Sequence, residues 1–458
     1  MRSLFLWLYL PLLTLPVALP SASAAAAKSI PVGIALGQAV VPLNGPWKFH
    51  TGDNSRWADS NFDDSSWETV DLTPPPGARD SDVGFTGYVP GWQSKGHPRY
   101  SGYAWYRIHV SVDGQFAEPL ELCGPFYVDV AYQVFANGKL LGGLGDFSGQ
   151  RPVMHNIHLP KLYPLPQSIA SAENGRSIVI AVRTWMPSWA LGPEAGGIHI
   201  APALGTIAGA NSLYHIQWSQ IIRGYIVDAS IGFIFLVLAL MACTLIPFDR
   251  SNSACFWLIA GLVLTSLRWA NQPIFFWWQS ESIREYELTT ILLFIPLSIA
   301  AWTLVWYRWF GLPDWMWMRP VVGVLALLYV GSVFSERTWF YGVFPHWFGT
   351  VTGFCVSAVR LAFVLLTLLI IFRVVRQAGN ARWFGLPAIL AVSVGLYARE
   401  LTMLGIPGIW FPFGVGVSLS QCGFMVSYVA LFLLLLHRLY SFRVQHTSVH
   451  PAFSSTKN

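Results

Sequence analysis

Two different patterns of hydrophobic and polar positions divide this chain. Residues 28–205 contain short stretches in which apolar and polar residues alternate, separated by turn residues, and this pattern indicates β-strands. From residue 225 onward the apolar residues form runs of about twenty, the length that crosses a bilayer as a helix. The sequence therefore predicts a mixed multidomain membrane protein, with an all-β sandwich followed by an all-α transmembrane bundle.

The strand pattern is clearest in residues 103–112. Tyr106 and Ile108 alternate there with Trp105 and Arg107, and successive side chains of a strand point to opposite faces. We expect one buried and one polar face.

Seven apolar segments follow the sandwich, after a predicted linker at residues 206–224. Each is long enough to span about 30 Å of hydrocarbon. The segments are residues 225–246, 254–275, 288–307, 315–335, 349–372, 383–404 and 413–436.

The first 24 residues have the features of a signal peptide. Arg2 precedes an apolar stretch, which ends in the small residues Ser-Ala-Ser-Ala. An uncleaved anchor helix is the alternative, and either version places the sandwich outside the cytoplasm.

Loop charges predict the same orientation. The loops between segments on the sandwich side carry only Arg284 and Arg337. The opposite side carries Arg250, Arg308, Arg319, Arg373, Arg376, Arg382, Arg438, Arg443 and Lys457. This bias predicts a multi-pass protein of the bacterial inner (cytoplasmic) membrane, with an extracytoplasmic N-terminal domain and a cytoplasmic C-terminus.

Composition narrows the function classes. The chain is 54% apolar and 11% charged, and its net charge of +5 comes from the membrane part. The basic residues therefore set topology and do not indicate nucleic-acid binding. We find no cysteine or histidine spacing typical of a metal site, no cofactor motif and no catalytic constellation. We expect no enzyme activity.

Five ionisable residues fall within the apolar segments: Asp228, Arg268, Arg360, Arg399 and Glu400. Charged groups are costly in hydrocarbon unless they are paired or hydrated, so they could form a polar network that transmits a signal. Alternatively, Asp228, Arg268 and Arg399 lie near segment ends and reach the headgroups. Arg360 stands in mid-segment and needs an interior partner, either Asp228 or Glu400.

Aromatic and planar polar residues of the sandwich are candidates for a ligand site. Flat rings stack on sugar faces, while planar donors and acceptors bind hydroxyl groups. The candidates are Trp92, Gln93, His97, Arg99, Tyr103, Trp105, Trp185 and Trp189. The alternative is that these aromatics pack in the core or against the helices.

Five short motifs occur in an order that resembles a known domain. They are LNGPWKF at 43–49, FDDSSW at 62–67, YSGYAWYR at 100–107, ANGK at 136–139 and IAVR at 180–183. Together they resemble the jelly-roll, galactose-binding-like domain of family 2 glycoside hydrolases. This resemblance implies a fold and leaves function open.

The sandwich followed by seven helices resembles the bacterial seven-transmembrane receptors with diverse intracellular signalling modules. That resemblance implies sensing of an extracytoplasmic small molecule or carbohydrate, with output through a kinase, diguanylate cyclase or phosphatase. Residues 437–458 are too few for such a domain, so we expect a separate cytoplasmic signalling protein as partner, besides membrane lipid. A transporter or channel, with the sandwich as a substrate-binding domain, is the alternative.

Overall fold

The computed structural model describes residues 40–111, 119–149, 152, 158–166, 177–188, 192–247, 253–279, 283–313, 317–340, 346–376 and 385–449. The predicted signal peptide and Trp189 lie outside these residues.

The N-terminal part is an antiparallel β-structure with two main sheets. One has six strands in the order β3-β2-β4-β10-β7-β8, and the other has four in the order β1-β12-β5-β9. The strands are β1 (Val40–Pro42), β2 (Trp47–Thr51), β3 (Glu68–Val70), β4 (Gly102–Ser111), β5 (Leu120–Cys123), β6 (Tyr127–Val128), β7 (Ala131–Ala136), β8 (Lys139–Leu144), β9 (Leu162–Pro164), β10 (Ser177–Met186), β11 (Ile198–Ile200) and β12 (Ala203–Thr206). Side chains of both main sheets meet in one core, as the strand pattern predicts.

The face of β4 that the sequence predicts to be polar is buried as well. Arg107 is fully buried, and its Nε donates to the carboxylate of Asp64 at 2.7 Å. Trp105 stacks on Phe135 and meets the edge of Trp57. The segment between β2 and β3 supplies Asp64 and Trp57 and so covers this face. An arginine can occupy such a position because a carboxylate and backbone carbonyls accept its hydrogen bonds.

Hydrogen bonding decides the charge of Asp64. Burial acts to raise the pKa of this carboxyl, but the hydrogen bonds from Arg107 and His109 hold the pKa below its usual range. Asp64 is therefore an ionised group inside the domain.

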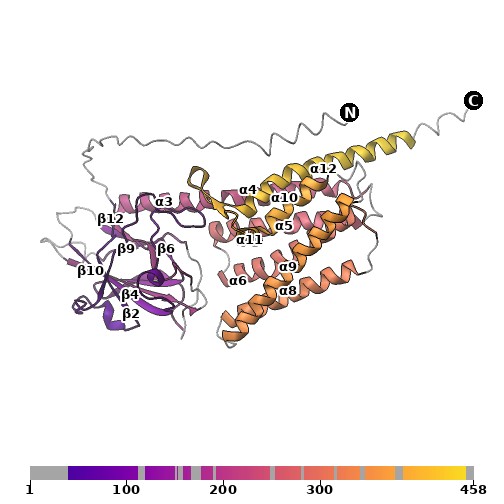
Figure 1. The fold of residues 1–458 in the computed structure, drawn as a ribbon. Helices are drawn as coiled ribbons and strands as arrows, with labels where there is room; N and C mark the ends of the chain where they lie inside the picture. The colour runs from indigo at the N-terminus through magenta and orange to yellow at the C-terminus, as the bar shows by residue number, and fades with distance from the viewer. Residues whose placement is uncertain are drawn as a thin grey trace, which may run out of the picture. The chain divides into compact units, whose positions relative to one another are not determined.

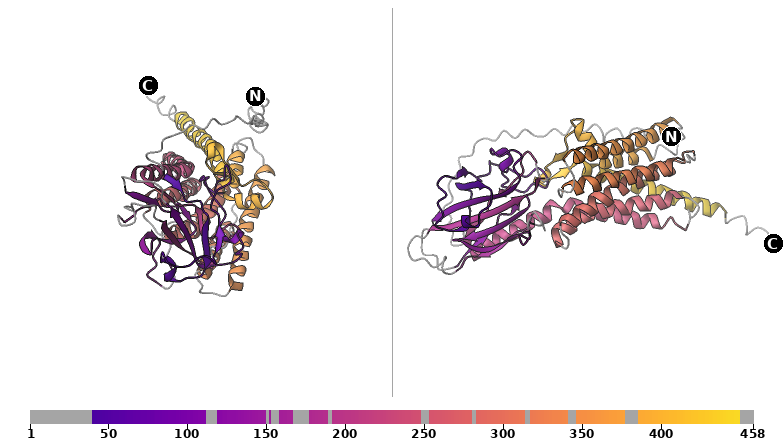
Figure 2. Two further views of the ribbon diagram at one scale, coloured as in Figure 1. Left: turned by 90° about the vertical axis from the view of Figure 1, so that its left-hand side faces the viewer. Right: turned by 90° about the horizontal axis from the view of Figure 1, so that it is seen from below.

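The C-terminal part is helical. Its elements are α3 (Ile207–Gly224), α4 (Ile226–Cys243), α5 (Ser253–Trp278), α6 (Ile283–Glu287), η4 (Leu288–Phe294), α7 (Ile295–Trp309), α8 (Met318–Phe340), α9 (His346–Arg376), α10 (Leu386–Leu396), α11 (Ala398–Met403) and α12 (Leu419–Val449). The long helices run side by side, as the right-hand view of Figure 2 shows.

The expectation of seven spans needs correction. Within the described residues, six helical segments are long and apolar enough to cross a membrane, and α6, η4 and α7 form one of them. The predicted segment 383–404 contains instead the short helix α10, which ends where Tyr397 leaves helical geometry (φ −111°, ψ 24°), and then α11. Six such helices are typical of an integral membrane protein. The seventh apolar segment is broken.

The predicted linker is also a helix. Thr206, the last residue of β12, accepts a hydrogen bond from Gly209 N and so caps α3. At the other end, the Tyr225 N–H donates to the Ile221 carbonyl at 3.3 Å, so that α3 passes almost directly into α4 (Figure 1). The sheet domain is thus joined to the first membrane helix by a helix. At the C-terminal end, α12 continues through residues 437–445.

Candidate functional site

Two of the ligand residues predicted from sequence are core residues. Trp92 and Trp105 are 2% and 1% exposed. The indole N–H of Trp92 donates to the Tyr100 carbonyl, and that of Trp105 donates to Asp53. Burial leaves neither ring a face for stacking on a sugar in this conformation.

The other predicted ligand residues do not make one obvious site. The Gln93 side chain donates to the Tyr100 carbonyl and accepts from the Arg99 N–H. His97 Nε2 lies 2.9 Å from Oε2 of Glu68. Arg99 is exposed, and Trp185 is half-buried. Tyr103 lies beneath the guanidinium of Arg183, 4.4 Å from ring centre to guanidinium carbon. Their role in ligand binding stays a prediction.

A different site is built around the loop of residues 79–86. Its shape comes from Asp80, whose carboxylate accepts hydrogen bonds from the backbone N–H groups of Asp82, Val83 and Phe85. Val83 and Phe85 are buried in a core cluster that also contains the helix residues Tyr225, Phe275 and Phe276. The loop is therefore part of the sandwich by sequence and is packed against the helices.

A hairpin from the helical part holds the other side of this loop. It is formed by β13 (Ile409–Trp410) and β14 (Val417–Ser418), between α11 and α12. The Gly416 N–H donates to the Val83 carbonyl at 3.1 Å, and Arg79 Nη1 donates to the Gly414 carbonyl at 3.0 Å. A Cβ on Gly416 would lie 1.9 Å from the Asp82 carbonyl oxygen, so only glycine permits this approach.

Loop, hairpin and helices together line a partly open cavity of about 220 Å³, which we name the junction cavity. The sandwich contributes Asp82 and Val83, and all other lining residues come from the helical part. Those residues are Asp228, Arg268, Trp269, Gln272, Thr290, Ile295, Gly416, Ser418, Ser420 and Gln421.

The junction cavity contains charged groups of both signs without direct partners. Arg268 lies over the Trp269 ring, 5.3 Å from its centre, and makes no ion pair with any described residue. The Asp82 carboxylate likewise has no hydrogen bond or ion pair in the described part of the chain. Asp228 is 2% exposed and accepts a hydrogen bond from the Gln421 amide. The expectation that Asp228 reaches the headgroups is therefore wrong, because it is a buried cavity residue.

Asp82 should give the protein a measurable pH dependence. Asp82 is exposed on one side, but the surrounding protein desolvates its carboxyl, and this desolvation, and then the neighbouring Asp80, raise the pKa of Asp82 from 3.8 to about 6. The folded protein thus holds this proton at a pH where the unfolded chain has lost it, so this group lowers stability as pH rises from about 4 to about 6. We expect Asp82→Asn to flatten the fall in melting temperature over that range. The exposed Asp59→Asn serves as control, and an unchanged slope in Asp82→Asn would contradict the assignment.

A second polar cluster lies inside the helical bundle. Arg360 Nε and Nη2 donate to the two carboxylate oxygens of Glu400 at 2.5 and 2.7 Å. Its Nη1 donates to the Tyr329 hydroxyl at 2.9 Å, and Nη2 also reaches the Leu396 carbonyl at 3.2 Å. Of the two partners that the sequence left open, the structure gives Glu400. The neighbouring Arg399 is exposed, as the headgroup alternative predicts.

This cluster coincides with the break between α10 and α11. Leu396 is the last residue of α10, and its carbonyl lacks a continuing helix to bond. Arg360 from α9 satisfies that carbonyl and binds Glu400 on the far side of the break. The ion pair therefore joins α9 to both halves of the broken segment.

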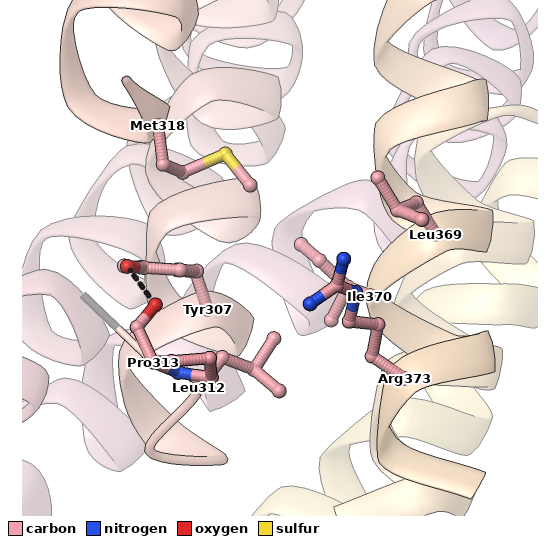
Figure 3. A pocket seen from close by; sticks show the side chains of 7 residues that line it. All are labelled: Tyr307, Leu312, Pro313, Met318, Leu369, Ile370 and Arg373. Carbon is pink, nitrogen blue, oxygen red and sulfur yellow. Dashed lines mark hydrogen bonds between the residues drawn. The ribbon is translucent and has the colours of Figure 1, made fainter. Parts of the chain in front are cut away.

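A much smaller cavity lies where the connection from α7 to α8 meets α9. It is lined by Tyr307, Leu312, Pro313, Met318, Leu369, Ile370 and Arg373 (Figure 3). The Tyr307 hydroxyl donates to the Pro313 carbonyl at 2.9 Å. At about 10 Å³ this space would hold about one water molecule, so we do not treat it as a ligand site.

No protein family model and no curated protein matches the sequence. Among solved structures, Bacteroides uniformis beta-glucuronidase 2 is similar with 18% identity over 37% of this chain and 18% of its own, at a TM-score of 0.26. A beta-glycosidase from Bacteroides vulgatus shows 23% identity over 36% and 20%, at 0.24. Bifidobacterium dentium beta-glucuronidase shows 18% identity over 32% and 20%, at 0.23. The chain spans about a fifth of the length of these enzymes.

Proposed function

We propose that this protein is a membrane signal-transduction receptor whose extracytoplasmic ligand binds in the junction cavity. The observation that carries the proposal is that the cavity wall contains residues of both the sandwich and the helices. Asp82 comes from the sandwich, whereas Asp228, Arg268 and Gln421 come from three membrane helices. A ligand that contacts both parts must favour one packing of loop against helices over another, because it shifts an equilibrium by its differential affinity for the two states.

Two helices, α4 and α12, connect the cavity to the far side of the membrane. Asp228 is the third residue of α4, and α4 runs from the junction to Cys243. Gln421 stands at the start of α12, which continues to Val449. We infer that a change at the junction moves the far ends of these two helices, where a cytoplasmic kinase, diguanylate cyclase or phosphatase would detect it.

Filling the junction cavity should mimic a bound ligand. Gln272 lines the cavity, and no hydrogen bond joins its side chain to another described residue. We expect Gln272→Trp to change the rate at which the exposed Cys243 thiol reacts with a maleimide, in nanodiscs and in a Cys355→Ser background that removes the other exposed cysteine. The exposed Ser212→Trp on α3 is the control. Equal rates in wild type, Gln272→Trp and the control would count against the proposal.

A transporter remains the second candidate because of the broken segment. Interrupted helices with a charged pair at the break are typical of substrate and ion pathways in transporters. The Arg360–Glu400 pair at the break between α10 and α11 has that character. Uptake of a cavity-binding solute into proteoliposomes, lost in Glu400→Gln, would favour transport. Binding without uptake would favour the receptor.

A further inference from the structure

We propose that the junction cavity binds a small zwitterion, with an amino-acid-like carboxylate on Arg268 and the ammonium group between Asp82 and Asp228. This inference rests on the proposed function and deepens it by naming the class of ligand. It follows from which polar groups of the cavity have partners within the protein and which do not.

The anion-binding half lies on α5. Arg268 offers a guanidinium that no described carboxylate pairs, and a guanidinium fork matches a carboxylate in a bidentate way. Trp269 beside it is only 7% exposed, and its indole N–H finds no hydrogen-bond partner among the described residues. The Trp269 ring is packed in the core of the bundle, so Arg268 carries the anion-binding half.

The cation-binding half faces it from two different parts of the chain. Asp82, an exposed residue of the sandwich loop, presents to the cavity a carboxylate that has no partner among the described residues. On α4, one oxygen of Asp228 accepts a hydrogen bond from the side-chain NH₂ of Gln421. The side-chain oxygen of Gln421 accepts from the Ser418 N–H, and this bond fixes the orientation of the Gln421 amide. The second Asp228 oxygen has no partner in the described residues. Two carboxylates of this kind suit an ammonium group, which carries three donors.

The cavity is poorly suited to a neutral sugar. A sugar site needs an open aromatic face. Among the described residues that line the cavity, Trp269 is the only aromatic one, and it is almost fully buried. Arg268 covers the ring of Trp269, and Phe424 packs against it in a T-shaped contact at 5.7 Å. The cavity would hold about seven water molecules, which suits a molecule of amino-acid size.

The test measures binding to the full chain in nanodiscs by thermal shift, since a ligand of the folded state raises the melting temperature. The probes are the twenty protein amino acids, their N-acetyl derivatives, which lack the ammonium group, and their methyl esters, which lack the carboxylate. Glucose and galactose are the neutral probes. We expect at least one free amino acid to bind and both of its blocked forms to bind about ten- to 100-fold more weakly.

Variants assign each half of the ligand to its side chains. Arg268→Gln should weaken binding of the free amino acid about ten- to 100-fold, and it should leave the weak binding of its methyl ester unchanged. Asp82→Asn should also weaken binding of the free amino acid. It should leave the weak binding of the N-acetyl form unchanged, because that form lacks the ammonium group. Arg56→Gln, on the exposed surface of the sandwich, is the matched control and should bind normally.

The outcomes separate this inference from the proposed function. Binding of a sugar that Gln272→Trp abolishes would overturn the zwitterion and keep the junction cavity as the receptor site. Binding that Gln272→Trp leaves intact would place the ligand elsewhere and overturn both. Absence of binding by all twenty amino acids would overturn the zwitterion, and the Cys243 measurement would still decide the receptor.

Discussion

Replacing Arg107 by leucine should lower the free energy of unfolding of the sandwich by about 3–5 kcal/mol. The guanidinium is fully buried and is the main partner of Asp64, so its removal leaves a buried carboxylate with only the His109 contact. Hydrogen bonds to the carbonyls of Trp57 and Asp59 are lost as well. Urea unfolding of the full chain, followed by tryptophan fluorescence, measures the change.

Arg183→Leu provides the matched control. Arg183 also makes a bidentate contact, with Asp53 at 2.8 and 2.5 Å, but both side chains are partly exposed. Partly exposed pairs contribute about 1 kcal/mol or less. Equal losses of stability in the two variants would contradict the claim that burial makes the Arg107 pair the more important one.

The second large effect is expected in the membrane bundle. Arg360→Leu should destabilise the bundle by about 3–5 kcal/mol, because the partly exposed Glu400 and the Leu396 carbonyl both lose the buried guanidinium that binds them. Glu400→Leu should do the same by leaving the guanidinium unpaired. Thermal unfolding in detergent, followed by circular dichroism, measures both variants.

The double variant Arg360→Leu/Glu400→Leu distinguishes a paired charge from a general loss of packing. Because replacement of a whole buried pair by apolar residues is often neutral, the double variant should recover most of the stability that each single variant loses. The exposed Arg399→Leu should have little effect. Additive losses in the double variant would show that the two residues act independently.

Much of the fold was predictable because periodicity reports burial. Alternation identified the strands, and runs of apolar residues identified six long helices. The broken segment was not predictable from hydropathy, since α10 and α11 together are as apolar as an unbroken span. The helix α3 was missed because its buried positions are mainly small or polar residues, such as Gly209, Ala210 and Gln217.

The junction cavity could be predicted only in part. Asp228 and Arg268 were singled out as charges in apolar segments, yet the sequence could not show that a sandwich loop reaches them. Asp82 carries no local signal, because its importance comes from a contact with Gly416, more than 300 positions away in the chain. The closest hint was the uncharged hairpin between α11 and α12, whose glycines allow the backbone of the loop to approach.

The same distinction applies to the aromatic residues of the sandwich. Trp92 and Trp105 looked like ligand residues because tryptophan is common in sugar sites, but it is equally suited to a core. Composition cannot separate these roles. The exposed fraction of each side chain in the structure separates them. It places the candidate site at the junction with the helices and not in the sandwich alone.

Hydrogen exchange on the Gln272→Trp chain in nanodiscs tests most directly whether the junction cavity couples the sandwich to the far ends of the helices. We predict altered exchange in two places at once, the loop of residues 79–86 and the ends of α4 and α12 distant from the cavity, with the Ser212→Trp control unchanged. Changes confined to the residues that line the cavity would contradict the coupling and leave the junction as a structural contact only.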